Sequence, residues 1–117
     1  TGTDTHFYIR LTDVDEEGRH LQLTDGARRM ALYQGVDTLS EITPHELYTV
    51  PVEATNPQAW RFEAGHRLGL IVNSHHWERF EKSTNVAGDY LFDESVAQEA
   101  TNTVVLGEST LTLTVAP

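Results

Sequence analysis

The chain has 117 residues, no cysteine, and 18 acidic against 8 basic residues, which gives a formal net charge of -10. A single domain of this length buries about two thirds of its unfolded surface, so it holds a core without a disulfide or a metal. The acidity disfavours nucleic acid and anionic membranes as partners, and the absence of cysteine excludes a disulfide framework, a thiolate zinc site and a cysteine nucleophile.

The first third of the chain predicts three strands. Residues 6–14 alternate apolar and polar side chains as a half-buried strand does, and the alternation restarts over residues 21–23 after an acidic turn that ends in Gly18. These two segments are expected to form a hairpin. The turn-forming residues 24–26 predict another break, after which residues 28–33 alternate again and predict a third strand.

The middle of the chain predicts a connection and two further strands. Residues 34–44 show no sustained period and end in a proline, which predicts a surface connection with room for one helical turn. Alternation resumes over residues 46–54, where Pro51 lacks an N–H for the ladder, so we expect an edge strand or a bulge there. In residues 67–74 every second residue is apolar, and this segment is expected to be a central strand.

The last third predicts a long loop followed by a hairpin. Residues 75–99 are rich in turn-forming residues and aromatic rings, with weak helical potential near their end. The segments 103–106 and 110–115 predict strands joined by a turn at residues 107–109. Seven or eight short strands with recurrent turns and no long helix predict a single all-β domain over residues 1–117, a jelly-roll-like β-sandwich.

A serine nucleophile is not expected in this chain. On an α/β hydrolase such a serine stands in a strained G-x-S-x-G elbow between a strand and a helix. Only Gly107-Glu108-Ser109-Thr110-Leu111 approaches this pattern, with leucine in place of the last glycine and a strand predicted on either side. We interpret it as a hairpin turn, and we expect neither a catalytic residue nor a cofactor.

Two patterns resemble metal sites. His75-His76, with His66 nearby, offers imidazole ligands, but neighbouring residues of an extended chain point to opposite faces. The alternating acids at residues 13–17, followed by Gly18, resemble the start of a calcium loop, yet the closing position carries threonine and the flanks predict strands. We interpret these patterns as surface or interface histidines and a solvated turn, and we expect no metal.

Four aromatic residues offer a platform for stacking a sugar ring: Trp60, Trp77, Tyr48 and Tyr90. Most aromatic rings in a small sandwich belong to its core or to an interface, and the acids offer no recognisable glycosidase pair. An independent carbohydrate-binding module is therefore an alternative function, and a protein-interaction module is another.

Several segments also resemble a known family in their order and spacing. They are Asp4-Thr5-His6-Phe7, Gly18, Asp25-Gly26-Ala27-Arg28, Gly65-His66-Arg67-Leu68 followed by Leu70, Val72, Ser74 and Arg79-Phe80, and the ending Asn102-Thr103-Val104 with residues 109–115. They are similar to the C-terminal domain of the cocaine esterase and X-Pro dipeptidyl-peptidase family of serine hydrolases. Trp77-Glu78 stands where this family commonly has phenylalanine and proline, and Thr114 where it commonly has proline, so the loop and the last strand are expected to differ.

The resemblance implies a galactose-binding-like jelly roll that packs on an α/β-hydrolase domain and helps to shape its substrate cleft. In that family the α/β-hydrolase domain carries the catalytic serine, aspartate and histidine, none of which maps onto this chain. The whole enzyme would cleave esters or amides, including peptides after an X-Pro pair, through an acyl-enzyme. The family domain usually begins several strands earlier, so the resemblance also implies an N-terminal truncation and an exposed sheet edge through which a homo-oligomer would form.

The loop over residues 75–93 is expected to contact the hydrolase domain. Its candidate interdomain or cleft contacts are His75, His76, Trp77, Arg79, Phe80 and Tyr90. Aromatic residues and arginine are the types that dominate the energetics of interfaces. A loop that merely covers one end of the sandwich is the alternative.

Overall fold

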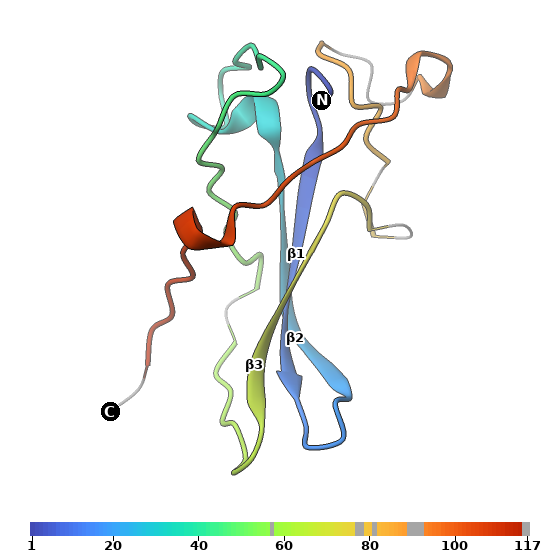
Figure 1. Cartoon of the computed structure of the whole chain (residues 1–117). Coiled ribbons are helices and arrows are strands. Elements are labelled where there is room, and N and C mark those ends of the chain that lie inside the picture. The colour runs from blue at the N-terminus through green and yellow to red at the C-terminus, as the bar shows by residue number, and fades with distance from the viewer. Residues whose placement is uncertain (57, 77–78, 81, 89–92, 116–117) are drawn as a thin grey trace.

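The computed structural model describes residues 1–56, 58–76, 79–80, 82–88 and 93–115. Figure 1 shows an elongated sheet with long connections around it. None of the helices in this part of the chain has the length and apolar character that crossing a membrane requires. The elements are β1 (His6–Val14), β2 (His20–Arg29), the 3-10 helix η1 (Met30–Leu32), β3 (Arg67–Asn73) and the 3-10 helices η2 (Glu94–Val96) and η3 (Leu106–Glu108).

The three strands form one antiparallel sheet in the order β2-β1-β3. β1 has the bounds that the sequence predicted, and it pairs with β2 as the predicted hairpin requires. Leu11 lies opposite Thr24 on β2 and opposite Leu70 on β3. The central strand is therefore β1. The prediction that residues 67–74 are central is wrong for this sheet, because β3 pairs with β1 alone among the described strands.

β2 continues through residues 24–26, where the sequence predicted a break. The predicted third strand over residues 28–33 is wrong, because η1 turns the chain there. The backbone N–H of Ala31 donates to Asp4 Oδ1 at 3.0 Å. A buried carboxylate from the segment before β1 thus takes a backbone donor that a strand would use in its ladder.

The segment around Pro51 runs beside the outer edge of β2 without forming the predicted edge strand. The N–H of Thr55 donates to the Asp25 carbonyl at 2.7 Å. Gly26 permits this approach, since a Cβ at that position would lie 2.1 Å from the carbonyl oxygen of Glu53. Pro51 has no N–H to donate, so single hydrogen bonds replace a continuous ladder along this edge.

The predicted C-terminal hairpin is also wrong. η3 occupies the predicted turn, and the described residues on either side of it are not assigned to strands. Leu111, Leu113 and Val115 keep their alternation but are 44%, 46% and 82% exposed, and Figure 1 shows their segment leading away from the sheet. Alternation alone does not hold a strand, because the hydrogen bonds must come from a neighbouring one.

The sheet has two unlike faces, since direct cross-strand partners project to the same side. Side chains on the first, the Tyr8 face, are buried and partly polar: Tyr8, Thr12, Val14 and Asp25. Side chains on the second, the Ile9 face, are apolar and half-buried or exposed: Ile9, Leu11, Leu70 and Val72. The predicted all-β class is confirmed, with an antiparallel sheet and almost no helix, as in an all-β sandwich.

Hydrogen-bonded charges hold much of the buried interior. Asp4 and Arg29 form an ion pair with 2.5 Å between Oδ2 and Nε, and their side chains are 4% and 9% exposed. The Nη2 of Arg29 also donates to the Gly88 carbonyl, and the N–H of Thr5 donates to Asp4 Oδ1 at 2.8 Å. One ion pair thus joins the start of β1, the end of β2 and the loop at Gly88.

Candidate functional site

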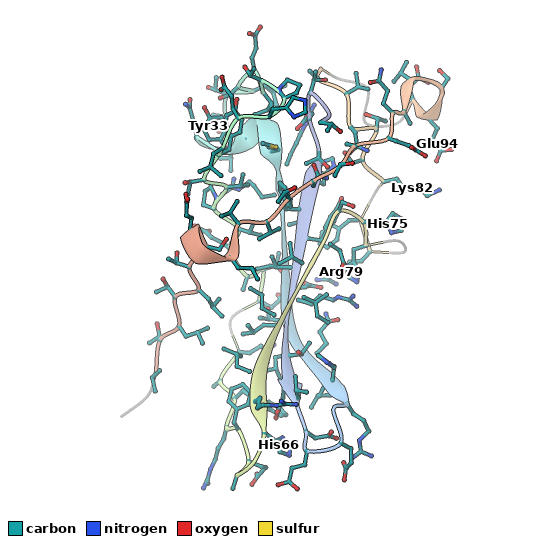
Figure 2. All side chains as sticks on the ribbon, in the orientation of Figure 1. Tyr33, His66, His75, Arg79, Lys82 and Glu94 are labelled. Carbon is teal, nitrogen blue, oxygen red and sulfur yellow. The ribbon has the colours of Figure 1, made fainter. Side chains whose placement is uncertain are left out.

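The structure describes four of the six residues predicted as interdomain or cleft contacts. Arg79 and His75 are exposed, whereas His76 and Phe80 are half-buried. Trp77 and Tyr90 lie outside the described residues. Figure 2 shows His75 and Arg79 on the segment that follows β3, so the predicted contact loop begins directly at the sheet.

Arg79 ties this loop to β2. Its Nε lies 2.6 Å from Asp25 Oδ2, and its Nη2 donates to Asp25 Oδ1 at 3.0 Å, which is the fork geometry that arginine prefers with a carboxylate. Asp25 also accepts from Thr55 Oγ1 at 2.9 Å and from Gln22 Nε2 at 3.3 Å. The Asp25 side chain is 3% exposed and that of Arg79 is 47% exposed, so the guanidinium is anchored on one side and faces solvent on the other.

Aromatic packing fixes the same part of the loop. The ring of Phe80 lies 5.2 Å from that of Tyr8 on β1, with 28° between the ring planes. The ring of His76 lies 5.8 Å from that of Phe80, and the Arg79 guanidinium is 5.5 Å from the Phe80 centroid. The structure thus brings three of the candidate contacts, His76, Arg79 and Phe80, together on the Tyr8 face.

A further histidine, His6, stacks on Tyr8 with 5.9 Å between ring centroids. The Nδ1 atoms of His6 and His76 are buried and have no hydrogen-bond partner among the described residues. Burial lowers the pKa of the His6 imidazole below its usual 6.5; the Asp4 carboxylate raises this pKa and the Arg29 guanidinium lowers it. The surroundings of His6 thus favour the neutral imidazole.

A second cluster surrounds Asp13 near the other end of β1. The Asp13 side chain is 5% exposed; its Oδ2 accepts from Trp60 Nε1 at 2.9 Å, and its Oδ1 lies 2.9 Å from His66 Nδ1. Because a carboxylate only accepts, His66 carries its hydrogen on Nδ1. Figure 2 places His66 at the opposite end of the sheet from His75.

Sequence reasoning missed this cluster, although a signal was present. Asp13 stands inside a strand that alternates regularly, where an acid is buried only if donors reach it. Trp60 carries an indole N–H that needs an acceptor when it is turned inward. The acid was instead interpreted as part of a calcium-like turn, and the tryptophan as part of a platform with Tyr48, whose ring packs on Tyr33 instead, with 5.1 Å between the ring centroids.

A cavity of about 490 Å³ opens beside the Asp13 cluster. Its walls come from the β1–β2 turn and from residues 60–66, and they include Leu21, Trp60, Arg61, Glu63 and His66. In the turn, the backbone N–H of Arg19 donates to Asp15 Oδ1 at 2.8 Å, and this hydrogen bond lowers the pKa of the Asp15 carboxyl. The acids that resembled a calcium loop are thus engaged by protein donors.

The histidines that resembled a metal site are not brought together. His66 binds Asp13 whereas His76 packs near Tyr8, and five residues of strand separate those two β1 positions by about 16 Å. Within the described ranges, no three side chains of His, Cys, Asp or Glu are grouped so as to hold a metal ion.

Ser109 lies in the turn around η3, not at a strand-to-helix elbow. Its Oγ donates to the Val105 carbonyl at 2.8 Å. A serine nucleophile needs a general base that accepts its proton, and a backbone carbonyl does not serve as one. The geometry gives Ser109 a structural hydrogen bond.

The sequence comparisons agree with this geometry. Residues 1–113 match the family described as the X-Pro dipeptidyl-peptidase C-terminal non-catalytic domain, and the chain belongs to this family. The resemblance inferred from the sequence is thereby confirmed.

Among curated proteins, the cocaine esterase of Rhodococcus sp. (strain MB1 Bresler) is similar to this chain. The two are 30% identical over 90 residues, which cover 75% of this chain and 15% of the esterase. The chain thus spans a small part of the relative that it matches.

Proposed function

We propose that this chain is the structural C-terminal part of a serine hydrolase of the esterase, acylase or X-Pro dipeptidyl-peptidase type. It packs on an α/β-hydrolase domain of the same protein, and the loop over residues 75–93 forms part of the substrate-cleft wall. The family description, which names a non-catalytic domain, and the match to 15% of an esterase support this proposal.

The anchoring of Arg79 is the observation on which the proposal depends. The guanidinium is fixed to the buried Asp25 by two contacts, and the neighbouring Phe80 ring packs on Tyr8. A wall of a binding cleft needs side chains that hold their position before a substrate arrives, because ordering them on binding costs free energy. The exposed half of Arg79 provides such a preset contact for a partner domain or a substrate.

The Ile9 face supplies the packing surface in this proposal. Leu68, Leu70 and Val72 of β3 are 39%, 44% and 38% exposed, a row of large apolar side chains along one strand. Such a row is expected to be covered by another layer of protein. The α/β-hydrolase domain is the proposed occupant, since the matched esterase is much longer than this chain.

The first test concerns catalysis. The purified chain is incubated with a p-nitrophenyl ester and with an X-Pro p-nitroanilide, and we expect no release of chromophore above buffer. Turnover that disappears in Ser109→Ala would contradict the non-catalytic assignment.

The second test concerns the cleft. In the full-length hydrolase, Arg79→Ala is expected to raise KM by about 3- to 10-fold with kcat nearly unchanged, as for the loss of one binding contact. Arg67→Ala, an exposed arginine on β3, is the matched control and should leave both constants unchanged. Equal kinetics for Arg79→Ala and the unmodified enzyme, with both folded, would overturn the cleft role.

Association of copies of this chain through the outer edge of β3, as a homo-oligomer, is a second proposal. β3 pairs with β1 on one side, and no other described strand pairs with its other side. Light scattering over a concentration series tests this prediction. A mass that stays monomeric would exclude association through the β3 edge.

A further inference from the structure

The Asp13 cavity lies apart from Arg79. Asp13 projects from the Ile9 side of β1, where it is the cross-strand partner of Leu68, whereas Asp25 and Arg79 lie on the Tyr8 side. The cavity therefore adjoins the apolar row of β3 proposed to pack on the hydrolase domain, and its function is independent of the role proposed for Arg79.

Trp60 and Leu21 supply apolar surface to the cavity. Trp60 is 47% exposed, although its one polar side-chain atom, Nε1, is satisfied by the buried Asp13. The surface that Trp60 presents to solvent is consequently hydrocarbon ring, held in one orientation by the carboxylate. Exposed aromatic surface of this kind is stabilised when a flat apolar ligand face covers it.

Polar groups surround this ring. The side chains of Arg61 and Glu63 line the cavity and form no ion pair with any other described residue. Because Asp13 fixes the Nδ1–H of His66, the Nε2 atom is the second polar atom of that ring. A planar guanidinium, a carboxylate and an imidazole offer both donors and acceptors for hydroxyl groups.

The charges of the cavity disfavour an anionic ligand. Asp13, Asp15 and Glu63 face two arginines, and Arg19 is already paired with Asp15, with 2.6 Å between Nε and Oδ2. The net charge of -10 on the whole chain also repels anions. A ligand that carries no negative charge and has an apolar face and a hydroxylated rim matches this arrangement.

We infer that the cavity beside Trp60 binds a pyranose ring of a neutral saccharide. One face of the sugar stacks on the indole, and its hydroxyl groups bond to Arg61, Glu63 and His66 Nε2. The volume of about 490 Å³ lies within the range of small-molecule sites. With one stacking ring on an open surface, the affinity is on the order of millimolar.

Titration by NMR tests this site directly. The probes are the methyl glycosides of glucose, galactose and mannose, and the readout is the indole N–H signal of Trp60 in the 15N-labelled chain. Trp77→Phe assigns the two indole signals, since the chain contains two tryptophans. We expect a saturable shift of the Trp60 signal with at least one glycoside.

Variants separate stacking from nonspecific effects. Trp60→Ala is expected to weaken binding, followed by the signals of the neighbouring backbone amides, by about 3- to 10-fold. Arg61→Ala and Glu63→Ala are exposed substitutions that should fold normally and weaken binding by a similar factor. Arg67→Ala, outside the cavity, should leave it unchanged.

Two results would overturn the inference. One is a Trp60 signal that does not move with any of the glycosides up to about 50 mM, far above a millimolar dissociation constant. The other is a dissociation constant, measured from the neighbouring backbone amides, that is unchanged in all three cavity variants. Binding of sulfate or of a proline-containing peptide without binding of any glycoside would likewise reject a saccharide as the ligand.

Discussion

Replacement of Arg79 by methionine tests how firmly the predicted contact loop is anchored. The substitution keeps most of the side-chain length but removes both contacts to Asp25. An exposed ion pair contributes about 0–1 kcal/mol, and breaking a fully buried one costs about 3–5 kcal/mol. Asp25 is buried, but Arg79 is half-exposed and Asp25 keeps its bonds to Thr55 and Gln22, so we expect a loss of about 1–2 kcal/mol.

Urea unfolding followed by tryptophan fluorescence measures this loss. With a slope of about 1–3 kcal/mol per molar urea, the midpoint should fall by roughly 0.3–2 M. Arg79→Lys retains the charge without the forked guanidinium, so its urea midpoint should lie between those of the unmodified chain and Arg79→Met. If the midpoint of Arg79→Met moved no more than that of the Arg67→Met control, the loop would not be anchored by this ion pair.

Substitutions at three further positions probe the fold. Asp4→Ala strands the buried Arg29 guanidinium and should cost about 3–5 kcal/mol, while Asp4→Asn, which keeps an acceptor for the backbone donors, should cost less in the same urea titration. The pKa of His6 is lowered in the folded state, so the unfolded chain binds a proton at this imidazole more readily. The contribution of His6 to stability is therefore complete above pH 6.5 and declines as the pH falls from 6.5 towards the folded-state pKa. In His6→Phe, the pH dependence of the unfolding midpoint should flatten. Gly26→Ala places a Cβ against the Glu53 carbonyl and should cost about 1–3 kcal/mol by calorimetry, whereas an unchanged melting temperature would mean that this chain segment is not fixed beside β2.

The sequence pattern predicted the local structure well where the strand that pairs with a segment follows it directly in the chain. β1 and its hairpin with β2 were predicted from alternation, because their pairing partner follows directly in sequence. The third predicted strand failed since the Asp4 carboxylate takes the N–H of Ala31, a contact between residues 27 positions apart. The C-terminal hairpin failed because alternation at Leu111 and Leu113 does not reveal whether another strand is available to pair with it.

The candidate sites divide in the same way. Arg79, Phe80 and His76 were selected because their residue types are common at interfaces, and the structure brings them together on Tyr8 and Asp25. The sequence could not show which acid binds Arg79, because Asp25 lies 54 positions earlier in the chain. The Asp13 cluster likewise joins residues 47 and 53 positions apart, and sequence spacing carries no information on such contacts.

The two faces of the sheet each carry a buried carboxylate with its own set of hydrogen-bond donors. Asp13 and Asp25 each accept hydrogen bonds from donors far away in the sequence, yet their side chains project from opposite faces of the same sheet. Residues around one acid can be exchanged during evolution without contact with those around the other. Substitutions around Asp13 are therefore expected to leave the contacts of Asp25 unchanged, and substitutions around Asp25 to leave those of Asp13 unchanged.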